Sequence, residues 1–293
     1  MSRFDFDENG EDISIEKPFD FSSRATIGCG GVAREAFFPK TEDALIRLLK
    51  RLELDGKAYC VLGGLSNVLP PDGVSKRVVV STKQMKTVCD DDGVFVQAGV
   101  TVGALLQYCK TTERSGAEFL AGIPCTVGGA LFMNAGVSGE YISQIVESVT
   151  AYIDGKKEVL SCQECDYAYK HSSFMQNGGI ILSAKLKLAK STKESVLKNI
   201  ARYAERRAHL PKGKSMGCVF KNPKDGLAGK IIEGAGLKGL RVGGAKISDE
   251  HANFIINDGG ATSEDIKKLI AFIKKAVFAQ YKISLQEEIR YLD

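Results

Sequence analysis

Residues 118–139 read Glu-Phe-Leu-Ala-Gly-Ile-Pro-Cys-Thr-Val-Gly-Gly-Ala-Leu-Phe-Met-Asn-Ala-Gly-Val-Ser-Gly. The stretch holds five glycines and one proline, yet most of its other side chains are apolar. Glycine in apolar surroundings indicates backbone that lies close to another element or to a ligand. Because Gly128 and Gly129 carry no Cβ, we expect their backbone N–H groups to be open to an anion. A tightly packed turn between two core elements accounts for the same pattern, so both interpretations stay open at this point.

A second small-residue stretch, residues 63–67, follows a predicted strand at 58–62. Gly63 and Gly64, with Ser66 and Asn67 close behind, are typical of a loop that wraps an anion with backbone amides and short polar side chains. The stretch does not read Gly-x-Gly-x-x-Gly and no long helix follows, so the doubly wound dinucleotide-binding fold does not fit. A type I′ or II′ turn is the alternative.

Composition describes an ordinary globular protein. The chain has 293 residues, a length that is enough for two or three domains. Of these residues, 44% are hydrophobic and 26% are charged. The net charge of +4 is small and the basic residues are scattered or gathered near 202–214, so we expect an anionic small molecule rather than nucleic acid as partner. The first sixteen residues are acidic and polar, unlike a signal peptide, and no apolar run is long enough to span a membrane. We therefore expect a cytoplasmic protein with no membrane partner.

The eight cysteines include one Cys-x-x-Cys pair, Cys162 and Cys165. No second pair or histidine cluster completes it, so we expect no metal site and no redox dithiol. Most of the cysteines lie beside apolar residues and are interpreted as small buried hydrophobes in a reducing compartment.

Short strands that alternate with a few helices predict an α+β fold, with a nucleotide-sized or flavin-sized site between subdomains. We expect a loose segment at 1–20 and a domain boundary near 190–200. The predicted strands are 35–38, 58–62, 77–81, 94–99, two strands within 145–159 around an Asp154-Gly155 turn, 179–188, 254–257 and 287–292. Two helices are predicted to begin at Thr41 and at Thr101. Three further helices are predicted at 194–207, 227–233 and 263–281.

Four clusters contain polar side chains next to residue types that seldom accompany them, and each cluster can be explained by structure alone. Cys218 stands where a turn would enter a strand, and a packed thiol is the simpler interpretation. The stretch 167–174 mixes aromatic, cationic and hydroxyl groups, as a polar surface turn would. Glu287 and Glu288 fit an exposed edge strand. His251 precedes an apolar strand, and a lone histidine is more often structural than functional.

Together these clusters are far more specific than any one of them. Four motifs occur in order: Gly-x-Ser-Asn-x-Leu at 64–69, Gly-Ile-Pro-x-Thr-Val-Gly-Gly-Ala-x-Phe-Met-Asn-Ala-Gly at 122–136, Gly-Cys-Val-Phe-Lys-Asn-Pro at 217–223, and Gly-Gly-Ala-x-Ile-Ser-x-x-His-Ala-Asn-Phe-Ile-Ile-Asn at 243–257. In this set the chain resembles the UDP-N-acetylenolpyruvoylglucosamine reductase family, flavoenzymes of bacterial peptidoglycan synthesis. The resemblance extends from about residue 20 to the C-terminus and is to the shorter form of the family.

The resemblance implies a two-part FAD-binding module of the vanillyl-alcohol-oxidase type, with subdomains at 21–86 and 87–195, between an N-terminal tail at 1–20 and an α/β substrate-binding domain at 196–293. By similarity, one loop would hold the FAD pyrophosphate and the glycine-rich stretch would line the flavin. The implied pyrophosphate residues are Gly63, Gly64, Ser66 and Asn67, and the implied flavin-lining residues are Ile123, Pro124, Thr126, Gly128, Gly129 and Asn134.

The resemblance also implies the chemistry. NADPH would reduce FAD, and the hydride would then pass to the enolpyruvyl group of UDP-N-acetylglucosamine enolpyruvate, giving UDP-N-acetylmuramate. Cys218 stands where the family usually has a serine proton donor, and Glu288 matches the catalytic glutamate, which would need a raised pKa to polarise a carboxylate. Asn222 and His251 match positions that contact the UDP-sugar, and Lys221 is the implied phosphate partner.

Lys170 is the clearest departure, because the family has arginine at this place in a Tyr-Arg-x-Ser sequence. Lysine keeps the charge but loses the planar fork of the guanidinium group. Cys125 in the flavin stretch and Leu65 before Ser66 both stand where glycine is usual. An active NADPH-dependent reductase is the favoured hypothesis. A catalytically weakened member that binds FAD or the UDP-sugar is the alternative, and an oxidase on the same module is a third.

Overall fold

The computed structural model describes residues 12–137, 139–224 and 226–292. The chain forms two compact units, and each is assembled from segments that are separated in the sequence. Unit 1 holds the residues up to Lys17, Glu35–Gly64 and Arg77–Ala208, and unit 2 holds Pro18–Arg34, Leu65–Lys76 and the chain from His209 onward.

The first sheet of unit 1 has the strand order β1–β4–β8–β5, with β1 antiparallel to β4, and β4 and β5 parallel to β8. Helix α1 (Glu42–Leu54) begins as predicted, because Thr41 accepts a hydrogen bond from the Ala44 amide. One face of α1 is buried in a cluster with Phe37 and Val80 of the sheet, and it consists of Leu45, Leu48, Leu49 and Leu52. The strands of this sheet are β1 (Ile13–Glu16), β4 (Ala36–Pro39), β5 (Tyr59–Leu62) and β8 (Val78–Ser81).

The second sheet of unit 1 is antiparallel, in the order β15–β14–β16–β10–β9. Asp154 and Gly155 both have positive φ, 48° and 81°, which confirms the predicted hairpin turn. The strands of this sheet are β9 (Val88–Asp90), β10 (Val94–Gln97), β14 (Val146–Ile153), β15 (Lys156–Ser161) and β16 (Ile180–Leu186).

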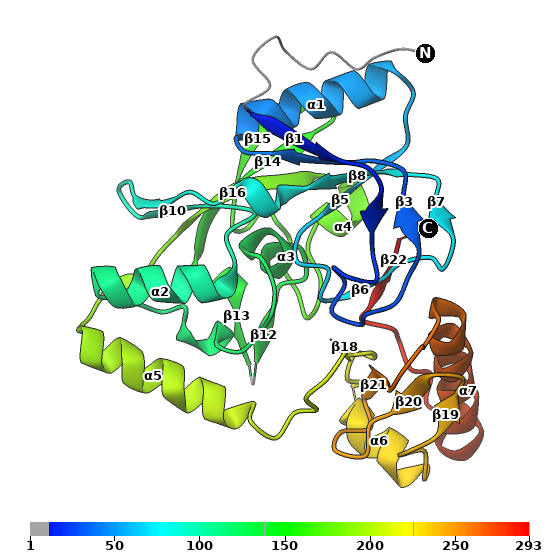
Figure 1. Ribbon diagram of the computed structural model, residues 1–293. Helices are drawn as coiled ribbons and strands as arrows, with labels where there is room; N and C mark the ends of the chain where they lie inside the picture. Colours follow the sequence, from blue (N-terminus) through cyan, green and yellow to red (C-terminus); the bar gives the residue numbers. More distant parts are fainter. Residues whose placement is uncertain (1–11, 138, 225, 293) are drawn as a thin grey trace. The chain divides into compact units, whose positions relative to one another are not determined.

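Three further helices matter for the site in unit 1. Helices α2 (Val102–Thr112) and α5 (Lys193–Arg206) lie side by side (Figure 1). Helix α3 (Val127–Phe132) packs on β10 and β16 and occupies the middle of the glycine-rich stretch. The shorter elements of the unit are α4 (Phe174–Asn177), β11 (Arg114–Ser115), β12 (Gly136–Val137), β13 (Glu140–Tyr141), β17 (Ala189–Lys190) and the 3-10 helices η1 (Thr82–Gln84), η2 (Glu118–Leu120) and η3 (Ile142–Ile145).

Unit 2 contains an antiparallel sheet in the order β18–β21–β20–β19, together with helices α6 and α7. Thr262 and Asp265 exchange hydrogen bonds as a capping box at the start of α7. Two small sheets, β2–β3–β7 and the parallel pair β22–β6, complete the unit. The elements are β2 (Phe19–Asp20), β3 (Val32–Ala33), β6 (Val68–Leu69), β7 (Val74–Ser75), β18 (Ser215–Cys218), α6 (Ala228–Gly234), β19 (Arg241–Val242), β20 (Ala245–Ile247), β21 (Phe254–Asn257), α7 (Ser263–Tyr281) and β22 (Arg290–Tyr291).

Two predictions about the chain ends differ from the structure. Within the predicted loose segment 1–20, residues 1–11 lie outside the described residues, but β1 and β2 are paired strands, so there the prediction is wrong. Phe19 explains part of the difference, because it is buried. The predicted strand 287–292 is reduced to β22, because the Glu288 amide bonds to Val219 whereas the Arg290 amide bonds to Asn67.

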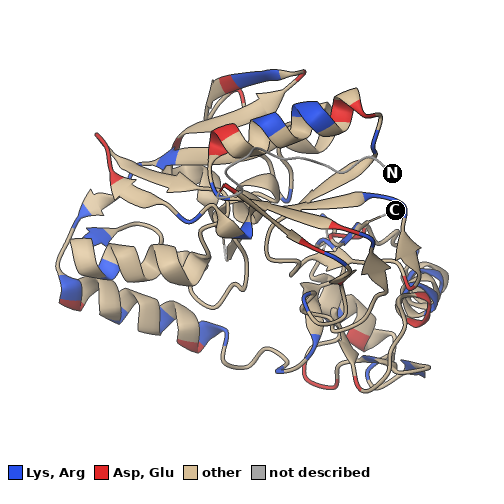
Figure 2. Cartoon of the chain, turned by 45° about the horizontal axis from the view of Figure 1, so that its top comes forward, with Lys and Arg blue, Asp and Glu red and all other residues tan. Residues whose placement is uncertain are grey.

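Lysine and arginine residues are interspersed with aspartate and glutamate along the backbone of α1 and α5 (Figure 2). Within the described ranges, no helix combines the length and the apolar character needed to cross a membrane.

Candidate active site

The end of β5 packs against the flavin-predicted loop within unit 1. A Cβ on Gly63 would lie 2.3 Å from Thr126 Oγ1, a distance that real Cβ atoms do not reach. At Gly64 the nearest atom would be the Pro124 carbonyl oxygen at 3.4 Å, an ordinary contact. Gly63 is therefore required by close packing, and the structure brings together two of the clusters that the sequence assigns to the cofactor.

The amides at the start of α3 are used inside the protein. Gly128 N donates to Ala98 O at 2.9 Å, and Gly129 N donates to the capping oxygen of Thr126 at 3.3 Å. The expectation that these two N–H groups are open to an anion is therefore wrong. A Cβ on Gly128 would lie 2.8 Å from Ala98 Cβ, so the packing interpretation of this glycine is confirmed.

The amides of the preceding loop behave differently. Among the described residues, none accepts a hydrogen bond from the backbone N–H of Gly63 or Gly64. Such amides suit the oxygens of a diphosphate, which is the part of FAD predicted here. The adjoining Leu65 is buried and has a φ of 51°, a backbone conformation that glycine adopts more readily than leucine.

Asn67 belongs to unit 2, where it joins two short strands. Its Nδ2 donates to Glu288 O at 3.1 Å, and Arg290 N donates to Asn67 O at 2.9 Å. The structure thus places one predicted cofactor residue directly against the backbone of a predicted catalytic one. Ser66 stands next to it in the same loop.

Lys170 lies in a tight turn of unit 1. Ala168 and His171 exchange backbone hydrogen bonds of 3.2 and 3.1 Å across the turn, and Lys170 has a φ of 53°. The side chain of Asn134 donates to Ala168 O at 2.9 Å, and Ser172 Oγ donates to Phe132 O at 2.7 Å. The turn that carries Lys170 is thereby fastened to the glycine-rich stretch.

Cys125 and its surroundings reveal a residue that the sequence did not indicate. Burial raises the pKa of the Cys125 thiol to about 12, while the positive charges of Arg207 and Lys170 partly oppose that rise. Arg207 ends helix α5, and a Cβ on Gly122 would lie 3.2 Å from its Cδ. Two cations therefore border the loop that also contains Ile123. Sequence alone gave no reason to separate Arg207 from the other basic residues of this helix.

Cys218 and Glu288 lie on paired backbone segments of unit 2. The Glu288 amide donates to Val219 O at 2.8 Å, and Phe220 forms a bridge with Glu287. Both Cys218 and Glu288 are half-buried. Cys218 ends strand β18, whereas we expected it at a turn before a strand, because the bulged pairing of β18 with β21 includes residue 218.

The predicted substrate residues also lie in unit 2. Asn222 Oδ1 accepts from the Ala228 amide at 3.0 Å, and a Cβ on Gly229 would lie 2.8 Å from the His251 ring, so both side chains meet the start of α6. His251 Nδ1 accepts from Asn253 N at 3.2 Å, which leaves the ring proton on Nε2. Burial lowers the pKa of His251, so the ring is a neutral donor. Lys221 is held by its amide, which donates to Gln286 O at 2.8 Å.

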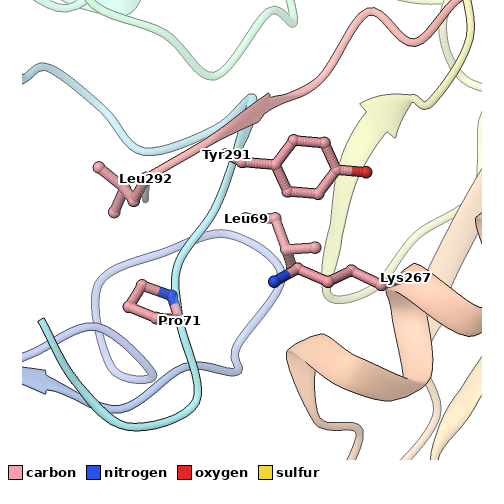
Figure 3. A pocket seen from close by; sticks show the side chains of 5 residues that line it. All are labelled: Leu69, Pro71, Lys267, Tyr291 and Leu292. Atoms are coloured by element: carbon pink, nitrogen blue, oxygen red, sulfur yellow. The ribbon is translucent and has the colours of Figure 1, made fainter.

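A surface pocket of unit 2, with a volume of about 320 Å³, lies elsewhere (Figure 3). Its polar groups are Lys267 and Tyr291, and the Lys267 ammonium lies 5.7 Å from the Tyr291 ring centroid. The predicted site residues do not contribute to its lining, so we assign it no part in the predicted chemistry.

Comparison with known proteins covers both parts of the chain. Residues 33–162 match the FAD binding domain family, and residues 208–292 match the C-terminal domain of UDP-N-acetylenolpyruvoylglucosamine reductase. The matches confirm the predicted α+β fold with an FAD-binding module followed by a second domain. The exact domain limits predicted from the sequence remain predictions.

Relatives that match nearly the whole chain share the same name. The UDP-N-acetylenolpyruvoylglucosamine reductase of Syntrophobacter fumaroxidans is 36% identical, covering 96% of this chain and 85% of the relative. That of Clostridioides difficile is 34% identical, covering 96% and 94%. The crystal structure of the Thermus caldophilus reductase superposes with a TM-score of 0.82 at 35% identity, covering 96% of this chain and 100% of that one. The chain belongs to the UDP-N-acetylenolpyruvoylglucosamine reductase family.

Proposed function

We propose that this chain is an FAD-dependent reductase that uses NADPH to reduce the enolpyruvyl double bond of UDP-N-acetylglucosamine enolpyruvate. The product is UDP-N-acetylmuramate, a precursor of peptidoglycan. The observation that carries the proposal is the backbone pairing of Val219 and Phe220, which directly follow Cys218, with Glu288 and Glu287 in a member of this family. We place the activity in the cytoplasm, in support of cell-wall growth, cell shape and division.

The residues of unit 1 fit FAD. Gly63 and Gly64 offer amides without an acceptor among the described residues, and they adjoin the loop with Pro124 and Thr126. These residues would hold the diphosphate and border the flavin ring. Ser66 and Asn67, which follow in the sequence and belong to unit 2, remain predicted ligands. When bound, FAD would supply hydride chemistry, with NADPH as the reductant and C3 of the enolpyruvyl group as the acceptor.

The side chains of this chain supply the proton and the charge stabilisation. Hydride addition at C3 places negative charge on C2 and the carboxylate of the substrate, and a proton must then reach C2. The Cys218 thiol is the proposed donor, and the resulting thiolate regains a proton from solvent. Lys170 and Glu288 are the proposed partners of the substrate carboxylate. A general acid of this kind contributes roughly 10²- to 10⁴-fold to the rate.

The nucleotide end of the substrate is assigned to the residues near α6. Lys221 would pair with a phosphate, and Asn222 and His251 would hydrogen-bond the UDP-sugar. His251 suits this role because its neutral ring presents Nε2–H as a donor.

Anaerobic absorbance of the purified protein tests the proposal. We expect a bound-flavin spectrum that NADPH bleaches and that UDP-N-acetylglucosamine enolpyruvate restores. A flavin that NADPH bleaches but the substrate does not restore would instead support the weakened binding protein that Lys170 suggests. Turnover driven by oxygen with another alcohol would indicate an oxidase.

A further inference from the structure

Both polar atoms of the Asn134 side chain form hydrogen bonds within unit 1. Its Nδ2 donates to Ala168 O at 2.9 Å, and its Oδ1 accepts from Ser143 N at 3.2 Å. The residue is only 3% exposed. A side-chain amide committed in this way has little capacity left for a ligand, although the sequence predicts that it lines the flavin.

The backbone of Asn134 has a separate task. It has a φ of 43° just after α3, where Asn134 N donates to Leu131 O and Ala135 N donates to Ala130 O. This is the Schellman ending of a helix, which glycine satisfies as well as asparagine. Ending the helix therefore does not require the side-chain amide.

The side chain instead fastens the turn that carries Lys170. Ala168, the acceptor, is the first residue of that turn, and Lys170 is two residues further along. A second tie comes from Ser172, which is fully buried and donates to Phe132 O at 2.7 Å. Both ties connect the turn to the segment 132–134, and they are set on either side of the lysine.

We propose that Asn134 is a positioning residue that fixes the turn of Lys170, so that the flexible ammonium group is held ready for the substrate carboxylate. The inference rests on the proposed function, in which Lys170 stabilises negative charge on the substrate. Lysine lacks the planar guanidinium group with which arginine binds a carboxylate. An ordered turn compensates for this, because the backbone around Lys170 then loses less conformational entropy when the substrate binds.

Two substitutions distinguish the hydrogen bonds of the Asn134 side chain from the role of its backbone in ending α3. Asn134→Asp keeps an acceptor for Ser143 N but removes the donor to Ala168 O and sets a carboxylate oxygen against that carbonyl. Asn134→Gly keeps the positive φ and removes both side-chain bonds. Asn177→Asp is the matched control. Within the described part of the chain, the side chain of exposed Asn177 bonds only through Oδ1, which accepts from Gly179 N, and aspartate preserves that bond.

The first readout needs no catalysis. Hydrogen exchange of the flavin-loaded protein should be faster at residues 168–171 in Asn134→Asp and Asn134→Gly than in wild type or Asn177→Asp. An unchanged exchange rate in both Asn134 variants would overturn the inference, whether or not the protein turns over.

The second readout is the pair of half-reactions. We expect bleaching by NADPH to keep its wild-type rate in Asn134→Asp and reoxidation by the enolpyruvyl substrate to slow at least tenfold. In a Lys170→Met background, adding Asn134→Asp should change the rate less than twofold, because Asn134 acts through the lysine. Loss of flavin from Asn134→Asp and Asn134→Gly, or additive effects in the double variant, would overturn the inference. Failure of wild type itself to reoxidise would count against the proposed function instead.

Discussion

Individual residues of this chain occupy backbone conformations that their type does not favour. Leu65 and Lys170 both have positive φ, at 51° and 53°, which costs about 1–2 kcal/mol for an L-residue other than glycine. Both lie in loops that the sequence assigns to the cofactor or to catalysis. Strain of this kind is typical of functional loops, where the surrounding structure holds it in place.

Lys170→Arg should be tolerated or should raise kcat/KM for the enolpyruvyl substrate. Both residues meet the same backbone strain, and arginine adds the bidentate geometry that suits a carboxylate. Steady-state kinetics of Lys170→Arg beside Lys170→Met measures the effect, and we expect the methionine variant to lose activity strongly. Complete loss of activity in the arginine variant would show that the site is built around lysine.

His251 makes stability depend on pH. Its pKa is lowered in the folded protein, chiefly by burial, whereas in the unfolded chain it returns to about 6.5. The stabilising contribution is therefore complete above about pH 6.5 and decreases below it, because only the unfolded state then binds the proton. Urea midpoints at pH 7.5 and 5.5 should differ more for wild type than for His251→Gln. Equal differences would contradict the assignment.

At the scale of elements, apolar periodicity predicted the regular helices well. Helices α1 and α7 begin where they were predicted, because threonine and acidic residues precede leucine- and isoleucine-rich stripes. Helix α3 was not predicted, since glycine is a poor helix former. Gly128 is needed because Ala98, which follows β10, lies too close to residue 128 for a Cβ to fit. This contact depends on the tertiary structure, so no local sequence pattern reveals it.

The two neighbouring glycines of α3 should respond oppositely to alanine. Gly128→Ala places its Cβ 2.8 Å from Ala98 Cβ and should cost about 1–3 kcal/mol. Gly129→Ala meets its nearest atom at 3.5 Å and should gain up to about 1 kcal/mol from helix propensity. Urea unfolding with flavin content recorded tests both. Flavin loss in Gly129→Ala without loss of stability would mark that residue as a flavin contact.

At the scale of the whole molecule, sequence motifs identified the family more fully than they described the arrangement of the chain. The motifs around Cys218 and Glu288 are about seventy residues apart, yet their backbones pair, as the resemblance required. The assembly of each unit from separate segments was beyond local patterns, because strand pairing between distant residues leaves no periodic signal. The same limit hid Arg207, whose contact with the flavin-predicted loop depends on the packing of α5.

The most direct test of the central claim, that Cys218 delivers the proton beside Glu288, is rapid-mixing absorbance of Cys218→Ala. NADPH should bleach its flavin at the wild-type rate, and reoxidation by the enolpyruvyl substrate should slow by at least about 10², the lower range for a lost general acid. Cys218→Ser, with a hydroxyl donor at the same place, should restore reoxidation. Loss of both half-reactions in Cys218→Ala, or loss of neither, would contradict the account.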